Sequence, residues 1–296
     1  MSLRTIDFIG IGAAKSGTTW LYDVLSLHPQ VCMSSKKEIN YFNKYMPADL
    51  KTPNWNYDKS IHWYHSYFGH HQVGQICGEL SPSYVMNVNA VEDIYNYNPD
   101  IKLIVVLREP IERLFSLYRY RKQIGNWQYR TFDHAVEHCP QFLSLSLYYE
   151  QLKIYFVRFS REQIKVLLFD DLKRNKNQFL LEVYDFLKIK PFFPEMMVQR
   201  SNVTVDVRSQ KLNHLIGQMR LYIHRNNLHF ILPPLRRLGV VPIAEYVRDK
   251  LNVSQRGKKA PELNKDLRNR LVPYFLKDIE SLEKLIDRDL SDWKCM

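Results

Sequence analysis

The sequence predicts an α/β protein in which a P-loop-like, doubly wound parallel sheet is flanked by helices. Apolar runs typical of buried strands, the clearest being residues 101–107 (IKLIVVL), alternate along the chain with amphipathic helical patterns. The first apolar run, at Phe8, Ile9 and Ile11, leads into a Gly-rich turn and then into a helix. The alternation predicts parallel strands joined by helices, and the turn predicts an anion site at a helix N-terminus.

Residues 7–20 (DFIGIGAAKSGTTW) contain this strand, the turn and the start of the helix. The unpaired amides and the dipole of a helix N-terminus attract anions, Gly12 and Gly17 allow close approach of the backbone, and Lys15 adds a charge. Three hydroxyl side chains lie in the same stretch: Ser16, Thr18 and Thr19. In the common nucleotide triphosphate motif the lysine follows the second glycine, whereas Lys15 precedes Gly17. We therefore expect a phosphate site of a different kind, with a Gly-rich turn that binds nothing as the alternative.

The remaining segments continue the alternation. Strands are predicted at residues 31–33, 75–79, 101–107 and 164–169, and helices at residues 18–27, 60–68, 87–97, 143–159, 178–187 and 261–287. Residues 210–251 change in character, with Leu215, Met219 and Tyr222 at helical spacing. We expect one domain over residues 1–296, in which residues 210–251 form a helical insertion or lid. Ordinary packing of this stretch against the main domain is the alternative.

Glu38 lies in the segment KKEINYF, one helix and one short strand after the Gly-rich turn. A carboxylate at that position is placed to act as a general base for a reaction at the turn. The alternative is a surface ion pair with Lys36 or Lys37, which is the more common role of an isolated glutamate.

Arg108 comes directly after the most apolar strand, and Ser116 follows two turns into the next helix. Ligands bind at the carboxyl ends of the strands in open parallel sheets. We therefore expect Arg108 to hold a second phosphate through two hydrogen bonds, with Ser116 beside it. The alternative is a salt bridge from Arg108 to Glu109 or Glu112.

The composition is that of an ordinary soluble protein, with 45% hydrophobic residues and a formal net charge of +11. The charge favours anionic partners, such as phosphorylated cofactors, acidic glycans, nucleic acid or a membrane surface. The four cysteines lie far apart and show no metal-site spacing, so we expect reduced thiols, no metal and a cytoplasmic location. We find no signal peptide and no apolar run long enough for a transmembrane helix, although residues 210–251 leave peripheral membrane contact as an alternative.

Taken together, these motifs resemble those of the PAPS-dependent sulfotransferases, especially the branch with the heparan sulfate N- and O-sulfotransferases. The resemblance covers residues 7–187 in order, resumes at Arg256 and ends at Trp293. It implies that the donor is PAPS (3′-phosphoadenosine 5′-phosphosulfate), that PAP is the product, and that no metal takes part. The implied acceptor is a small molecule or a glycan, acidic acceptors included, with a carbohydrate hydroxyl as the first choice.

The resemblance also implies a role for each matching residue. The turn residues bind the 5′-phosphosulfate: Lys15, Ser16, Gly17, Thr18 and Thr19. Arg108 and Ser116 bind the 3′-phosphate, and a late basic loop closes over the cofactor with Arg256, Gly257 and Lys258. Glu38 is the general base, and Lys15 neutralises the charge that develops on the leaving PAP. We add three candidate contacts to the acceptor: Lys37, Ser81 and Tyr148.

The chain departs from the pattern of the family in two places that concern the acceptor. The heparan sulfate O-sulfotransferases carry a lysine in the segment that here reads Glu79-Leu80-Ser81-Pro82. Their cysteine-bridged region before the late basic loop is replaced by residues 210–251. Sulfation of a lipid or of a carrier-bound metabolite is therefore an alternative to carbohydrate sulfation.

Two other classes of protein fit parts of the pattern. A P-loop kinase is one alternative, with Asp170 and Asp171 as the magnesium-binding carboxylates after a strand. The position of Lys15 before the second glycine argues against it. A nucleic-acid-binding module is the other, because the chain is basic and rich in aromatic residues; we expect no nucleic-acid partner.

Overall fold

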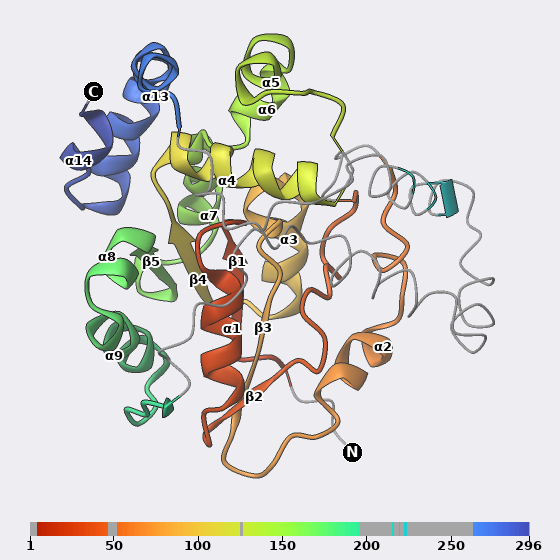
Figure 1. The fold of residues 1–296 in the computed structure, drawn as a ribbon. Helices are drawn as coiled ribbons and strands as arrows, with labels where there is room; N and C mark the ends of the chain where they lie inside the picture. Colours follow the sequence, from red (N-terminus) through yellow and green to blue (C-terminus); the bar gives the residue numbers. More distant parts are fainter. Residues whose placement is uncertain are drawn as a thin grey trace. The chain divides into compact units, whose positions relative to one another are not determined.

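The computed structural model describes residues 5–46, 52–124, 127–195 and 263–295, together with Leu215, Met219, Tyr222 and Ile223. Its centre is a five-stranded sheet with strand order β2-β3-β1-β4-β5 (Figure 1), in which every pairing is parallel. The strands are β1 (Phe8–Gly12), β2 (Val31–Met33), β3 (Ile76–Leu80), β4 (Lys102–Leu107) and β5 (Ile164–Leu168). The predicted α/β class with a parallel sheet is therefore confirmed.

The central strand is β1, which pairs with β3 on one side and β4 on the other. Gly10 lies opposite Leu80 of β3 and Ile104 of β4. The chain moves outward from β1 to β2, returns through β3, and then crosses to β4. This reversal of direction places the ends of β1, β3 and β4 side by side, where open α/β sheets bind their ligands.

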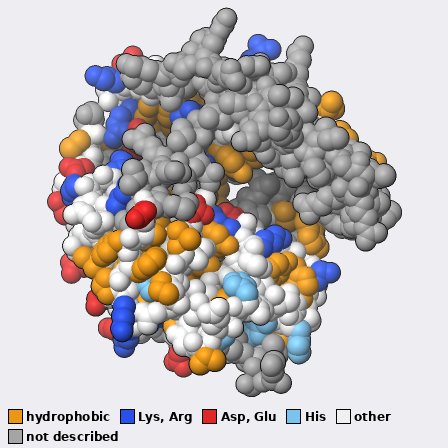
Figure 2. All heavy atoms as spheres, turned by 60° about the horizontal axis from the view of Figure 1, so that its bottom comes forward, with side chains coloured by type: hydrophobic (Ala, Val, Ile, Leu, Met, Phe, Trp, Pro, Cys, Tyr) orange, Lys and Arg blue, Asp and Glu red, His pale blue; other side chains and the backbone are white. Residues whose placement is uncertain are grey.

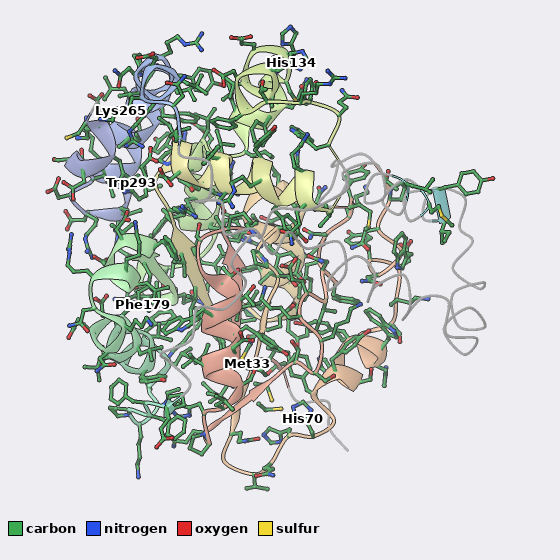
Figure 3. The ribbon with its side chains drawn as sticks, viewed as in Figure 1. Met33, His70, His134, Phe179, Lys265 and Trp293 are labelled. Atoms are coloured by element: carbon green, nitrogen blue, oxygen red, sulfur yellow. The ribbon has the colours of Figure 1, made fainter. Side chains whose placement is uncertain are left out.

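One face of the sheet is covered by α1 (Thr18–Ser26), α8 (Phe169–Arg174) and α9 (Lys176–Leu187) through a common hydrophobic core (Figure 1). Within β4, Ile104 and Val106 belong to this core. Leu103 and Val105, whose side chains point to the other face of the sheet, are equally buried, so the strand is covered on both faces. Phe179 of α9, labelled in Figure 3, packs edge-on against Trp20 of α1. These contacts fix the direction of α1, whose N-terminus begins at the Gly-rich turn.

The remaining helices of the described residues are α2 (Ile61–His65), α3 (Val88–Tyr97), α4 (Pro110–Gln123), α5 (Phe132–His138), α6 (Pro140–Ser144), α7 (Tyr148–Arg158), α13 (Lys265–Ile286) and α14 (Ser291–Lys294). Three short 3-10 turns are η1 (Ser66–Phe68), η2 (Tyr84–Met86) and η3 (Arg161–Gln163). In Figure 1, α3 and α7 lie on the opposite side of the sheet from α1.

The helix predicted at residues 143–159 is wrong at its start, because α6 ends at Ser144 and α7 begins at Tyr148. The amides of Tyr148 and Tyr149 donate to the carboxylate of Asp278, at 2.8 and 3.1 Å. A carboxylate that is far away in the sequence therefore caps the N-terminus of α7. The periodicity of the local sequence contains no sign of this cap.

The chain divides into two compact units, residues 1–113, 145–202 and 272–296, and residues 114–144 and 203–271. The first unit holds the whole sheet. In the second, Arg270 pairs with Asp133 and Glu137, and the Tyr118 hydroxyl donates to the carbonyl of Arg130. The predicted insertion at residues 210–251 lies outside the described residues except at Leu215, Met219, Tyr222 and Ile223, which are helical. None of the described helices is long and apolar enough to cross a membrane.

Candidate active site

The carboxyl ends of the parallel strands bring most of the predicted residues to one edge of the sheet. The Gly-rich turn follows β1, the segment with Lys37 and Glu38 follows β2, Ser81 follows β3, and Arg108 follows β4. This edge is therefore the candidate active site.

The Gly-rich turn has the backbone geometry of an anion site. Gly17 precedes the first residue of α1 with a φ of +86°, and no side chain caps the helix. A Cβ at Gly17 would lie 3.0 Å from side-chain atoms of Leu172 and Phe169, so the position requires glycine. Ser16 is fully buried, and its hydroxyl has no hydrogen-bond partner among the described residues. A buried hydroxyl without a partner beside an uncapped helix N-terminus fits an anionic ligand.

Arg108 connects the end of β4 to this turn. Its Nη1 donates to the carbonyl oxygen of Lys15 at 3.3 Å, and its Nη2 lies 3.0 Å from a carboxylate oxygen of Glu112. The guanidinium also lies 5.0 Å from the centre of the Phe169 ring. The Nε atom is buried and has no partner in the described part of the chain. The structure thus joins two motifs that are 93 residues apart. It also contains the salt bridge from Arg108 to Glu112 that was the alternative to phosphate binding.

Two side chains support this region, and one of them, Arg113, was missed by sequence reasoning. Arg113 is fully buried, and its Nε donates to the carbonyl of Ala14 at 2.9 Å, while Nη1 donates to Leu145 and Ser146. Tyr148, predicted to contact the acceptor, is also fully buried, and its hydroxyl donates to the carbonyl of Arg108 at 2.7 Å. Arg113 therefore supports the turn, and Tyr148 supports the strand end that carries Arg108.

Glu38 lies in the loop after β2, with its Oε1 3.3 Å from Nζ of Lys37. The Glu38 side chain is 36% exposed and that of Lys37 is 15% exposed. The ion pair offered as the alternative is therefore present, and it leaves part of the carboxylate accessible. The role of Glu38 as a base stays a prediction.

Glu79 is the second residue that sequence reasoning missed. It is fully buried near the end of β3, and its carboxylate accepts hydrogen bonds from the hydroxyls of Ser81, Tyr84 and Tyr64. Burial raises the pKa of Glu79 to about 7, although these hydrogen bonds lower it, and the charge of Glu38 adds to the increase. An ionisable group with such a pKa close to the candidate base is unusual in a purely structural core.

Of the remaining predicted site residues, Ser81 and Ser116 lie among the described residues and residues 256–258 do not. Ser81 is fully buried, and its hydroxyl is used by Glu79 and by the amide of Asn40, so it faces protein rather than an acceptor. Ser116 is half-buried on α4, in the second compact unit. Residues 256–258 of the late basic loop lie outside the described residues.

The carboxylates assigned to magnesium in the kinase alternative have protein partners. Asp170 accepts from Nε1 of Trp293 at 3.1 Å and pairs with Lys173 (Trp293 is labelled in Figure 3), while Asp171 pairs with Arg288 at 2.7 Å. Burial by itself would raise the pKa of Asp170, but Lys173 and Trp293 lower it below its usual value. In the part of the chain that the structure describes, no group of three His, Cys, Asp or Glu residues is arranged to hold a metal.

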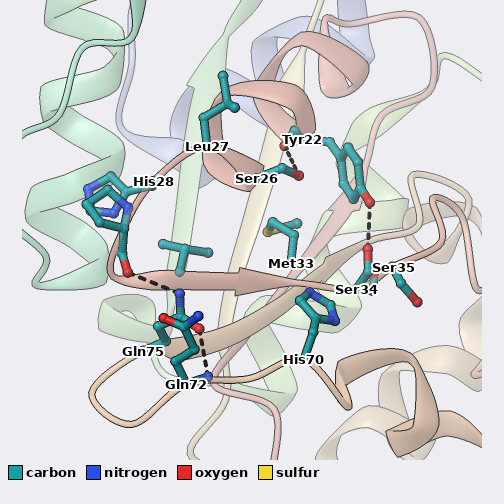
Figure 4. A pocket seen from close by; sticks show the side chains of 12 residues that line it. Tyr22, Ser26, Leu27, His28, Met33, Ser34, Ser35, His70, Gln72 and Gln75 are labelled. Carbon is teal, nitrogen blue, oxygen red and sulfur yellow. Dashed lines mark hydrogen bonds between the residues drawn. The ribbon is translucent and has the colours of Figure 1, made fainter.

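A pocket of about 480 Å³ lies beside the edge strand β2 (Figure 4). Its lining includes Tyr22, whose hydroxyl donates to the carbonyl of Ser34, and the rings of His28 and His70. Burial lowers the pKa of His28, and its Nε2 bonds to the carbonyl of Lys190. None of the predicted site residues lines this pocket, so it is separate from the turn and from Arg108.

The charged side chains offer no simple basic surface on the face shown in Figure 2. There, the described Lys and Arg side chains are interspersed with Asp and Glu side chains. The net charge of +11 is therefore not gathered into one stripe on the described part of that face.

Comparison with known proteins gives consistent matches. Residues 5–211, more than half of the chain, match the family described as "Sulfotransferase domain". The membrane-associated sulfotransferase kil1 of Dictyostelium discoideum is 26% identical over an alignment of 305 positions, gaps included. The alignment covers 70% of this chain and 62% of that protein. The human heparan sulfate glucosamine 3-O-sulfotransferase 5 is 37% identical over 108 residues, covering 36% of this chain and 28% of that protein.

The chain thus spans 62% and 28% of the lengths of these two curated relatives. Among solved structures, a sulfotransferase from Alicyclobacillus acidocaldarius has a TM-score of 0.66 at 23% identity, covering 99% of this chain and 100% of that one. At this identity the likeness concerns the fold.

Proposed function

The chain belongs to the family of sulfotransferase domains, and from this premise we propose that it transfers a sulfuryl group from PAPS to an acceptor hydroxyl or amine. The observation that carries the proposal is the contact between Arg108 and the carbonyl of Lys15. It joins an uncapped helix N-terminus to a guanidinium. Each of the two contributes a buried polar atom that has no hydrogen-bond partner among the described residues, Ser16 Oγ and Arg108 Nε. Two anion-binding elements in contact suit a donor that carries phosphate at both its 5′ and 3′ positions.

In this proposal, the residues of the turn bind the 5′-phosphosulfate and Arg108 binds the 3′-phosphate, with Ser116 and residues 256–258 as further expected contacts. When bound, PAPS supplies an activated sulfuryl group. Glu38 accepts the proton that the acceptor hydroxyl loses as its oxygen binds sulfur, and Lys15 stabilises negative charge on the departing phosphate. Positive charge from lysine, arginine and helix amides serves this chemistry without a metal.

A carbohydrate is the acceptor that we favour. The name of the human relative describes sulfation of glucosamine in heparan sulfate, and the net charge of +11 suits an acidic glycan. Lys37, beside Glu38, is a candidate contact for an acidic group of the acceptor. Sulfation of a lipid or carrier-bound metabolite is the alternative. Mass spectrometry of acceptor libraries incubated with PAPS distinguishes these classes.

We keep a cytoplasmic location as a prediction. None of the four cysteines forms a disulfide in the described part of the chain, which suits a reducing compartment. Cell fractionation with a membrane wash tests it, because a peripheral membrane protein would appear in the salt-released fraction.

Calorimetric titration with PAP and with ATP, in the presence of magnesium or of a chelator, tests the assignment of the donor. We expect PAP to bind in both conditions and ATP to bind weakly. Tight binding of ATP that requires magnesium would instead identify a P-loop kinase.

A further inference from the structure

We propose that Glu79 is a positioning residue for the transfer reaction: its buried carboxylate holds the loop that carries Glu38. This inference rests on the proposed function. The loop is defined here as the base segment, residues 38–43, and the connection runs through two hydroxyl groups rather than through direct contact with the acceptor.

The connection begins with three short hydrogen bonds. Oε2 of Glu79 accepts from the Ser81 hydroxyl at 2.7 Å. Oε1 accepts from the hydroxyls of Tyr84 at 2.8 Å and Tyr64 at 3.0 Å. All four side chains are fully buried, so no water competes for these donors.

Two of the hydroxyls extend the connection to the base segment. Ser81 Oγ accepts from the backbone amide of Asn40 at 3.0 Å, and the Tyr84 hydroxyl accepts from the amide of Phe42 at 3.4 Å. In addition, the ring of Tyr64 stacks on that of Tyr41, with centroids 4.7 Å apart. Each of the three residues bound to Glu79 therefore also contacts the base segment.

The charge of Glu79 fixes the direction of these bonds. A carboxylate only accepts hydrogen bonds, so each hydroxyl gives its single proton to Glu79 and turns its lone pairs toward other donors. Ser81 and Tyr84 are then acceptors for the two amides of the base segment. A protonated Glu79 must donate its own proton to one of these hydroxyls, which leaves one hydroxyl proton without its acceptor and weakens the connection.

The surroundings of Glu79 place this change in an accessible range of pH. Burial raises its pKa to about 7, the hydrogen bonds from Ser81, Tyr84 and Tyr64 lower it, and Glu38 raises it further. Tyr64, Tyr84 and Tyr97 also interact electrostatically with Glu79, and burial raises the pKa of each of them, so these phenols stay neutral over this range. The rate of transfer should therefore fall as the pH drops below neutral, because the base segment is then held less firmly. We call this decrease the acid limb of the pH profile.

Glu79→Gln tests the proposal, because glutamine keeps the size of the side chain but is neutral. The matched control is Tyr155→Phe, which removes a buried hydrogen bond of 2.9 Å to the carbonyl of Tyr84 without touching the base segment. We measure kcat, KM and PAP affinity for each protein across the range around neutral pH. A misplaced catalytic group costs up to about 100-fold in rate.

We expect Glu79→Gln to lower kcat by about 10-fold or more and to keep PAP affinity. The pH profile of its kcat should lack the acid limb near neutral pH. Tyr155→Phe should keep the rate and the limb. An unchanged kcat and pH profile in Glu79→Gln would overturn the proposal. A parallel loss of PAP affinity, or the same loss of rate in Tyr155→Phe, would also overturn it, since either result indicates general destabilisation.

Amide hydrogen exchange at Asn40 and Phe42 separates this inference from the proposed function. We compare protection factors of the wild type and of Glu79→Gln at the same pH. Above neutral pH the two amides should be protected in the wild type and less protected in the variant, and equal protection would overturn the inference. If the wild type transfers no sulfuryl group from PAPS, the proposed function fails, but the exchange result still decides whether Glu79 holds the segment.

Discussion

Nε of Arg113 donates a hydrogen bond of 2.9 Å to the carbonyl oxygen of Ala14, which ties α4 to the anion-binding turn. The same guanidinium reaches the Leu145 carbonyl and the Ser146 hydroxyl, and it stacks over the ring of Tyr148 at 5.4 Å. Because the side chain is fully buried, these contacts are not exchanged for water. Arg113 thus holds the turn by its backbone and leaves the helix amides free for a ligand.

Replacement of Arg113 should weaken donor binding. In Arg113→Lys, one ammonium group cannot reach all of these acceptors. We expect the dissociation constant of PAP to rise about 10-fold, which corresponds to about 1.4 kcal/mol, measured by calorimetry. Arg158→Lys is the control, since Arg158 stacks on Tyr95 and pairs with Glu92. Equal PAP affinity in the Arg113 variant and the control would contradict a role of Arg113 in holding the turn.

The glycine at the start of α1 offers a test with an internal control. Gly17 and Gly74 have φ values of +86° and +89°, but only at Gly17 would a Cβ meet other atoms within 4 Å. Gly74→Ala should cost about 1 kcal/mol of unfolding free energy from its backbone conformation alone. Gly17→Ala should cost about 1–3 kcal/mol more through crowding of Leu172 and Phe169, and it should also weaken PAP binding. Equal losses in urea denaturation would mean that the turn accommodates the methyl group.

Arg108 should determine selectivity for the 3′-phosphate. Arg108→Ala removes the guanidinium, so we expect PAP affinity to fall about 10- to 100-fold, while the affinity for AMP, which lacks that phosphate, changes little. Arg161→Ala is the control, because it lowers the net charge by the same amount. The hydrogen bond that it removes is the one to the carbonyl of Leu285. If PAP and AMP lose affinity in the same proportion, Arg108 does not recognise the 3′-phosphate.

The pH dependence of stability should carry the signature of Glu79. Because burial raises its pKa from 4.5 to about 7, the folded protein binds this proton more tightly than the unfolded chain does. The stabilisation is fully present at a pH below the pKa that Glu79 has in the unfolded chain. It is lost as the pH rises through about 7, the pKa of Glu79 in the folded protein. Relative to Glu79→Gln, the wild type should lose about 3 kcal/mol of unfolding free energy over this interval. Parallel stability curves for the two proteins would show that the pKa is not raised.

The regular elements could be predicted because their signals are local. The run at residues 102–107 is buried on both faces as its composition indicates, and Asn87 caps α3 with its own side chain. Gly17 has a positive φ, a backbone conformation that the glycine in this turn already indicates. The approach of Arg108 to the turn after β1 also followed from the sequence, since parallel strands bring their carboxyl ends together.

The supporting residues could not be predicted because their partners are distant. Asp278 caps α7 from 130 residues away, and Trp293 binds Asp170 from 123 residues away. The local sequence does not mark Glu79 as a buried hydrogen-bonded carboxylate, and only the structure shows three hydroxyls gathered around it. Ser81 follows directly after β3, at the edge of the sheet where ligands are expected, but its buried hydroxyl donates to Glu79.

Turnover of PAPS by Glu38→Gln tests the central claim most directly. The assay follows sulfated product by mass spectrometry, with the acceptor that the wild type uses, and Glu162→Gln, at an exposed glutamate, serves as the control. Glutamine keeps the shape of the side chain but cannot accept the proton of the acceptor. We predict unchanged PAP affinity and a kcat lower by about 100- to 10,000-fold, as expected for loss of a general base. Wild-type turnover in Glu38→Gln would contradict the account.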